Sequence, residues 1–194
     1  MKTFLAELKS SALLTLVFAV LLCGVYPLVV WAGAQALFPA QANGSLITDK
    51  DGTVRGSALL AQSFTSDKYF HPRPSAAGAG YDAANSSGTN LGPTSKKLAD
   101  SIAAAVTAYR AENSLAADAP VPADAVTSSG SGLDPHISVA NAQLQAARVA
   151  KARNLTPGQI SVLVGAHTEG RDFAVFGEPR VNVLLLNLAL DQRH

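Results

Sequence analysis

The residues that could do chemistry in this chain of 194 residues are few and lie far apart. Its four histidines, at positions 71, 136, 167 and 194, show neither the HExxH pattern nor the paired spacing of metal ligands. A G-x-S-x-G nucleophile turn fails at "SSGSG" (residues 128–132), because Ser129 stands where the first glycine should be. The carboxylates offer no evident acid–base pair, so we expect no catalytic residue and no metal site.

Two glycine-rich turns could instead present backbone amides to a phosphate. They are "GAG" at residues 78–80 and the Gly/Ser turn at residues 128–132. A Walker-type loop requires G-x-x-x-x-G-K-[ST], which the sequence lacks. Nucleic acid is disfavoured as a partner, because the net charge is only +1 and phosphate-binding proteins carry a clear basic excess.

The most conspicuous turn-rich stretch is "YFHPRPSAAGAGYDAANSSGTNLGPTSKKL" (residues 69–98), whose order is too varied for a flexible spacer. Two interpretations stay open. The stretch either packs as an ordered loop against its own domain, or it also extends that surface toward a partner protein. For the second interpretation the candidate contact residues are His71, Arg73, Tyr81, Asn85 and Asn90.

The elements that position these residues begin with an apolar N-terminal segment. No charged residue occurs between Lys9 and Asp49, and "ALLTLVFAVLLCGVYPLVVWAGA" (residues 12–34) is almost wholly apolar. A helix rises about 1.5 Å per residue and needs roughly 20 residues to cross the hydrocarbon core. The sequence therefore predicts a transmembrane helix over residues 12–34, in contact with membrane lipid and kinked at Pro27.

The flanking charges give this helix an orientation. Lys2 and Lys9 precede it, whereas the first cation after it is Lys50, so the positive-inside rule places the N-terminus in the cytoplasm. Residues 1–11 are then a short cytoplasmic segment, residues 35–42 a juxtamembrane segment and residues 43–194 an extracytoplasmic domain. The alternative is a signal peptide cleaved near Ala40 and Ala42, but its apolar run would be nearly twice the usual length.

Local patterns predict an α+β domain after this anchor. Residues 45–57 read as a hairpin around Asp51-Gly52, and residues 125–128 as a short strand. A helix follows the cap Pro93-Thr94, and a second helix covers residues 138–155, with Arg148 near its C-terminal end. The core face of the first helix consists of Leu98, Ile102, Ala105, Val106 and Tyr109.

Two further elements complete the predicted domain. In "TPGQI", Thr156 is a helix N-cap with Pro157 at the first position and Gln159 three residues after the cap. The apolar run in "GEPRVNVLLLNLALDQRH" (residues 177–194) is a helix from near Pro179 or a buried strand, and its length favours the helix. Cys23 is the only cysteine, so no intrachain disulfide can form and the domain must be held by packing.

Three long blocks together carry a family resemblance. They are residues 69–98, "SGSGLDPHISVANAQLQAARVAKARNL" and "HTEGRDFAVFGEPRVNVLLLNLALD". With the N-terminal anchor they resemble, in order and over nearly the whole chain, the C subunit of the Kdp potassium-transporting P-type ATPase, the KdpC family.

The resemblance implies a non-catalytic subunit in the bacterial inner membrane. Its expected partners are a potassium-selecting channel-like subunit, an ATP-hydrolysing P-type subunit and a small single-helix subunit. The complex handles ATP and potassium, and we expect this chain alone to bind no cofactor. In the family the C subunit is described as a catalytic chaperone that raises the ATP affinity of the pump subunit. The Gly/Ser turn invoked there for nucleotide contact loosely matches Ser129, Gly130, Ser131 and Gly132.

An extracytoplasmic domain conflicts with direct ATP contact, so the expected effect on ATP affinity is indirect. We expect support of assembly and turnover, with a contribution at the external potassium entrance. The alternative is a membrane-anchored envelope hydrolase or ligand-binding protein that uses the loop of residues 69–98 as its pocket. A convergent His/Asp/Ser site would favour that alternative.

Overall fold

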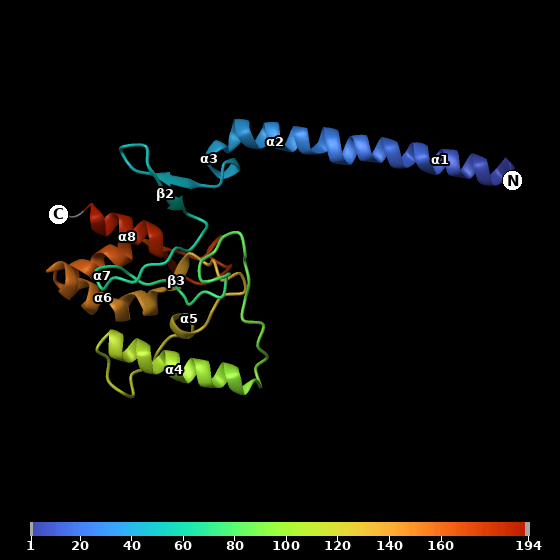
Figure 1. Ribbon diagram of the computed structural model, residues 1–194. Coiled ribbons are helices and arrows are strands. Elements are labelled where there is room, and N and C mark those ends of the chain that lie inside the picture. The colour runs from blue at the N-terminus through green and yellow to red at the C-terminus, as the bar shows by residue number, and fades with distance from the viewer. Residues whose placement is uncertain (1, 193–194) are drawn as a thin grey trace. The chain divides into compact units, whose positions relative to one another are not determined.

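The computed structural model describes residues 2–192 and divides the chain into two compact units, residues 1–46 and 47–194 (Figure 1). The architecture is α+β, as predicted: an N-terminal apolar helix is followed by a domain of helices and small sheets. His194, one of the four histidines considered above, lies outside the described residues.

The N-terminal unit is a long helical run. It comprises α1 (Lys2–Phe18), a π-helical segment (Ala19–Val25), α2 (Tyr26–Leu37) and the short α3 (Pro39–Ala42). Within residues 2–192 one helix, Thr3–Leu37, is long and apolar enough to span a membrane by length and composition, with a mean hydropathy of 2.6. Pro27, where the sequence suggested a kink, lies just after the π-helical segment. A proline has no amide hydrogen and so interrupts the helical hydrogen bonds, and a π-helical turn is a common local adjustment to such an interruption.

The second unit contains two small sheets. The strands β1 (Leu46–Thr48) and β2 (Val54–Ser57) form the predicted hairpin, and Gly52 in its turn has a φ of 78°. A three-stranded antiparallel sheet has the order β3 (His136–Ser138), β5 (Arg180–Asn182), β4 (Thr168–Glu169). In this sheet Val181 pairs with Ile137 on one side and with Thr168 on the other.

Within residues 47–192 five helices accompany the sheets, and all of them except α5 begin after a side-chain N-cap. They are α4 (Lys96–Glu112), α5 (Ala123–Val126), α6 (Val139–Arg153), α7 (Pro157–Ala166) and α8 (Val183–Asp191). The Thr156–Gln159 capping box is present as predicted. On α4 the five predicted core positions are buried or half-buried. The cap of α4 is Ser95 rather than Pro93-Thr94, because the Ser95 hydroxyl accepts from the Leu98 amide.

Two predictions about element type were also wrong. Residues 125–128 do not form a strand: Ala123–Val126 is the single turn α5, whose Asp124 accepts hydrogen bonds from Ser138 and Asn141. The C-terminal apolar run is not one helix from Pro179. It begins as strand β5 and becomes helix α8 only at Val183, because Asn182 is extended and caps the helix by accepting from the Leu185 amide.

The hydrophobic core lies among α6, α7, α8 and the three-stranded sheet (Figure 1). It includes one side chain from outside these elements, Phe70, which is fully buried. Its other large members are Ile137, Val149, Ile160, Leu163, Val164, Val181, Val183, Leu186 and Leu190. The loop of residues 69–98 is therefore fixed at its start by a core residue.

Candidate functional site: the loop of residues 69–98 and its polar support

The start of the loop is an extended segment held by side chains instead of by a neighbouring strand. The Phe70 amide donates to Asn187 Oδ1 at 2.8 Å, and Asn187 Nδ2 donates back to the Phe70 carbonyl at 2.9 Å. Gln145 makes the same pair of hydrogen bonds with the His71 backbone: its Oε1 accepts from the His71 amide at 2.7 Å, and its Nε2 donates to the His71 carbonyl at 3.1 Å. Buried backbone groups must be paired, and these two amide side chains from α6 and α8 supply the pairing.

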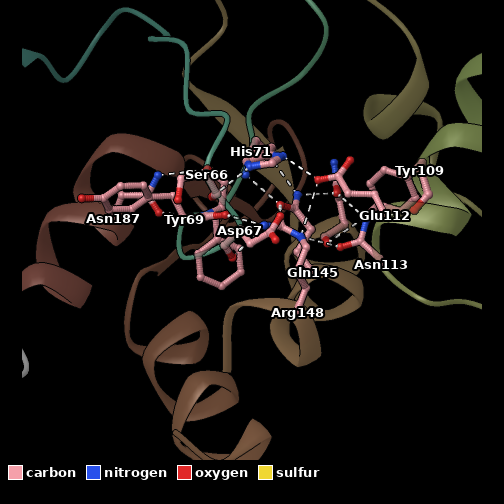
Figure 2. Close-up of polar contacts among 12 residues, drawn as sticks. Ser66, Asp67, Tyr69, His71, Tyr109, Glu112, Asn113, Gln145, Arg148 and Asn187 are labelled. Carbon is pink, nitrogen blue, oxygen red and sulfur yellow. Dashed lines mark hydrogen bonds and ion pairs between the residues drawn. The ribbon is translucent and has the colours of Figure 1, made fainter. Parts of the chain in front are cut away.

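Arg148, on α6, extends this support toward residues 67–69 (Figure 2). Its Nη1 donates to the carbonyls of Asp67 and Tyr69 at 2.9 and 3.0 Å. Its Nη2 donates to Gln145 Oε1 at 2.8 Å, and its Nε donates to Asn113 Oδ1 at 3.1 Å. Burial lowers the pKa of the guanidinium, but an arginine remains charged in a protein. Its hydrogen-bond partners must therefore offset the cost of burying this charge.

His71 links the loop to α4 (Figure 2). Its Nδ1 lies 2.6 Å from Glu112 Oε1, and its Nε2 lies 3.2 Å from the Ser66 carbonyl. The hydrogen bond with His71 and the charge of Arg148, 3.5 Å from the same carboxylate oxygen, lower the pKa of Glu112 against the opposing effect of burial. Both ring nitrogens of His71 are therefore engaged inside the domain.

Farther along, the loop packs on the Gly/Ser turn of residues 128–132. The Ser75 hydroxyl donates to the Gly132 carbonyl at 2.6 Å, and the Ser87 amide donates to the Ser131 carbonyl at 3.0 Å. Gly132 has a φ of 66°, and a Cβ built on it would lie 2.6 Å from the Ser87 carbonyl oxygen and 2.7 Å from the Ala77 nitrogen. Only glycine fits this contact, which seats the loop on the turn.

Arg73 and Tyr81 brace the middle of the loop. Arg73 Nη1 donates to Asp134 Oδ2 at 3.0 Å, and Tyr81, in a left-handed conformation with a φ of 57°, donates its hydroxyl to the Arg73 carbonyl at 2.8 Å. Burial would raise the pKa of Asp134, but hydrogen bonds from His136 and Arg73 outweigh it and bring the pKa to about 2. The ion pair is therefore intact at neutral pH.

The candidate partner-contact residues thus fall into two groups. His71, Arg73 and Tyr81 are half-buried and bonded within the domain, whereas Asn85 and Asn90 are exposed. Asn85 donates to Asp82 Oδ2 at 2.6 Å, and Asn90 has a φ of 52°. Contact of these residues with a partner stays a prediction.

The nucleotide-contact candidates Ser129, Gly130, Ser131 and Gly132 form the turn that receives the loop. Gly130 approaches the loop closely, because a Cβ on Gly88 would lie 3.0 Å from its carbonyl oxygen. The carbonyls of Gly132 and Ser131 accept hydrogen bonds from the loop, and the Gly132 amide donates to the Ser129 carbonyl within the turn. A role in nucleotide contact stays a prediction.

Two clefts flank the polar network. One, of about 510 Å³, is lined by residues that include Asp67, Glu112 and Arg148. The other, of about 260 Å³, includes Glu112, His71 and Tyr81 among its lining residues.

The three described histidines each bond a carboxylate or a backbone carbonyl: His71 with Glu112, His136 near Asp134, and His167 with the Leu163 carbonyl. Within residues 2–192 no group of three or more His, Cys, Asp or Glu side chains could hold a metal ion.

Sequence reasoning missed the residues that organise this site. Arg148 was assigned to the C-terminal end of its helix, but it is buried at the centre of the network. The signal was present in the spacing: Asn141, Gln145 and Arg148 recur at helical intervals, on the same face as Ala142, Ala146 and Val149. A polar stripe on the buried face of a helix indicates partners elsewhere in the chain.

Comparison with known proteins gives a consistent result. The protein family described as "KdpC: K+-transporting ATPase, c chain" matches residues 8–192. A "Potassium-transporting ATPase KdpC subunit" of Mycobacterium tuberculosis is 57% identical over 186 residues, covering 96% of this chain and 98% of the relative. The proteins of the same name from Myxococcus xanthus and Rhodospirillum rubrum are each 59% identical, over 94% and 89% of this chain and 87% and 89% of the relatives.

Proposed function

Because the chain belongs to the KdpC family of potassium-transporting ATPase subunits, we propose that it is a non-catalytic subunit that supports assembly of the complex and raises ATP affinity or turnover of the pump subunit. Its partners are the potassium-selecting channel-like subunit, the ATP-hydrolysing P-type subunit and the small single-helix subunit. ATP and potassium are handled by the complex, and this chain alone binds no cofactor.

One observation carries the non-catalytic role: the reactive side chains of the candidate site are bonded inside the domain. His71, Gln145 and Arg148 hold the extended segment, and Arg73 pairs with Asp134. A histidine that acts as a general base needs a ring nitrogen free to face a substrate, whereas a docking surface needs a loop held in one conformation. The network supports docking by the loop, through Asn85, Asn90 and the neighbouring backbone.

Binding to one conformation of the pump subunit is enough to change its ATP affinity. A chain that binds the ATP-competent state more tightly shifts the population toward it, and the coupling between the two sites is reciprocal. A tenfold gain in ATP affinity requires only about 1.4 kcal/mol of differential binding. The effect needs no contact between ATP and this chain, and the domain contributes at the external potassium entrance.

The same proposal includes a topology. The apolar helix Thr3–Leu37 anchors the chain in the bacterial inner membrane in contact with lipid, with the N-terminus in the cytoplasm and residues 43–194 outside. A membrane-impermeant label for lysines tests this arrangement in intact cells, because Lys96 and Lys151 are exposed on the domain. Labelling from the cytoplasmic side alone would overturn the topology and revive direct nucleotide contact at Ser129–Gly132.

The functional test compares the purified complex with and without this chain. We expect omission to abolish potassium-stimulated ATP hydrolysis and the purified chain alone to hydrolyse no ATP. Full activity without the chain would refute the proposed role. Hydrolysis of a small substrate by the chain alone would favour the envelope hydrolase instead.

A further inference from the structure

A group of exposed apolar side chains lies at the tip of the connection between β4 and β5. Phe173 is 91% exposed, Val175 69% and Phe176 67%. In the rest of residues 47–192 the exposed large apolar side chains stand singly, as Val162 does on α7. Three such side chains within four positions form a patch of the kind that marks an interaction site.

The turn that presents these side chains has a left-handed backbone conformation that its residues disfavour. Asp172 and Phe176 exchange two backbone hydrogen bonds, of 2.8 and 2.9 Å, and the Val175 amide donates to the Asp172 carbonyl at 3.2 Å. The two central residues, Phe173 and Ala174, have φ values of 52° and 61°. Such hairpin turns strongly favour Asn-Gly at these positions. Phenylalanine at this turn holds an aromatic ring away from the domain, at a cost to the turn itself.

The charges around the tip argue for a protein as the occupant. Arg171 bonds Glu178 at 2.7 Å, and Arg180 bonds Glu169 at 3.0 Å and Asp172 at 3.2 Å. Two arginines against three carboxylates leave this rim at a net charge of −1. A loop that enters an anionic lipid surface is normally flanked by unpaired cations, which this rim lacks. A second copy of the chain would bring two rims of the same sign together, which disfavours that pairing.

We propose that Phe173, Val175 and Phe176 are an anchor that enters an apolar pocket on another subunit of the potassium-transporting complex. The pocket has a neutral or basic rim, because it meets a rim of net charge −1. An apolar centre inside a ring of polar groups that excludes water is the usual anatomy of an interaction hot spot. This inference rests on the proposed function, since it takes the partner from the same complex.

The test uses the full chain co-expressed with the other subunits. The double variant Phe173→Ser/Phe176→Ser removes the two rings, and we expect its association with the complex to weaken at least tenfold. The control Val162→Ser removes an apolar side chain of α7 that is about as exposed as Val175 and Phe176, and it should leave association unchanged. The control Ala174→Gly relieves the left-handed strain at position 174 but keeps all three apolar side chains, so it should bind as the unchanged chain does. Thermal unfolding of each full chain in detergent checks that the fold is retained.

Three results would overturn the inference. The first is that the double variant associates with the complex as tightly as the unchanged chain does, while the activity of the complex still requires this chain. This result would refute the anchor and leave the proposed function standing. The second is quenching of a Phe173→Trp variant, in a Trp31→Phe background, by brominated lipid when no other subunit is present, which would identify lipid as the occupant. The third is predominant self-cross-linking of a Phe173→Cys variant in a Cys23→Ser background, which would identify a second copy. Full activity of a complex that lacks the chain would instead refute the proposed function and remove the premise.

Discussion

Gln145 is the residue whose replacement should reveal most about the loop support. Its side chain is 1% exposed and makes four hydrogen bonds. Two join the His71 backbone at 2.7 and 3.1 Å, one joins Asn141 Oδ1 at 2.9 Å, and one joins the Arg148 guanidinium at 2.8 Å. Gln145→Leu keeps a side chain of similar size and removes all four.

The expected loss of stability follows from these partners. A neutral hydrogen bond contributes about 1 kcal/mol and a charged one about 1.5–3 kcal/mol, and each buried group left unpaired adds a desolvation cost. Water can reach part of the site, because His71 is only half-buried, and this offsets some of the loss. We therefore expect Gln145→Leu to lower the free energy of unfolding by about 3–5 kcal/mol, a large share of the roughly 5–15 kcal/mol typical of a folded domain.

Gln143→Leu is the matched control. It makes the same substitution two positions earlier on α6, at an exposed residue whose side-chain oxygen accepts a hydrogen bond from the Ser161 hydroxyl at 2.9 Å. Its expected cost is below about 1 kcal/mol. The assay is urea unfolding of the full chain in detergent, together with hydrogen exchange of the peptide that contains the His71 amide. A Gln145→Leu variant as stable as Gln143→Leu, with unchanged protection of that peptide, would refute the assigned support.

Two further substitutions test the rest of the site. Gly132→Ala should lower the free energy of unfolding by about 2 kcal/mol or more, because its Cβ would meet backbone atoms on two sides. The control Gly130→Ala has open space at its Cβ and should cost less than about 1 kcal/mol. Equal costs of the two variants in urea unfolding would contradict the close approach at Gly132. The pKa of Asp134 is about 2, below its ordinary value of 3.8, so the carboxylate stabilises the fold above pH 3.8 and this contribution is lost as the pH falls toward 2. It amounts to roughly 2 kcal/mol at most. Asp134→Asn should therefore flatten the stability profile between pH 4 and pH 2, and an unchanged slope would count against the pairing with Arg73 and His136.

Local signals in the sequence predicted much of the secondary structure. The Asp51-Gly52 hairpin and the Thr156–Gln159 capping box depend on groups within a few residues of one another, so their sequence patterns are direct evidence for them. The core face of α4 followed from helical spacing alone. The prediction failed where a short apolar run could satisfy two structures, as at residues 180–191, where the pairing of Val181 with Ile137 and Thr168 makes the first part a strand.

The sequence by itself determined the apolar N-terminal helix, the Thr156–Gln159 capping box and the family, because each depends on composition or on neighbouring residues. Only the tertiary structure decided how the loop is held. Gln145 meets His71 across 74 residues, Arg148 meets Asp67 across 81, and Asn187 meets Phe70 across 117. No local pattern encodes such pairs, since they form only when packing of α6 and α8 brings their buried polar side chains to backbone groups that lack a strand partner.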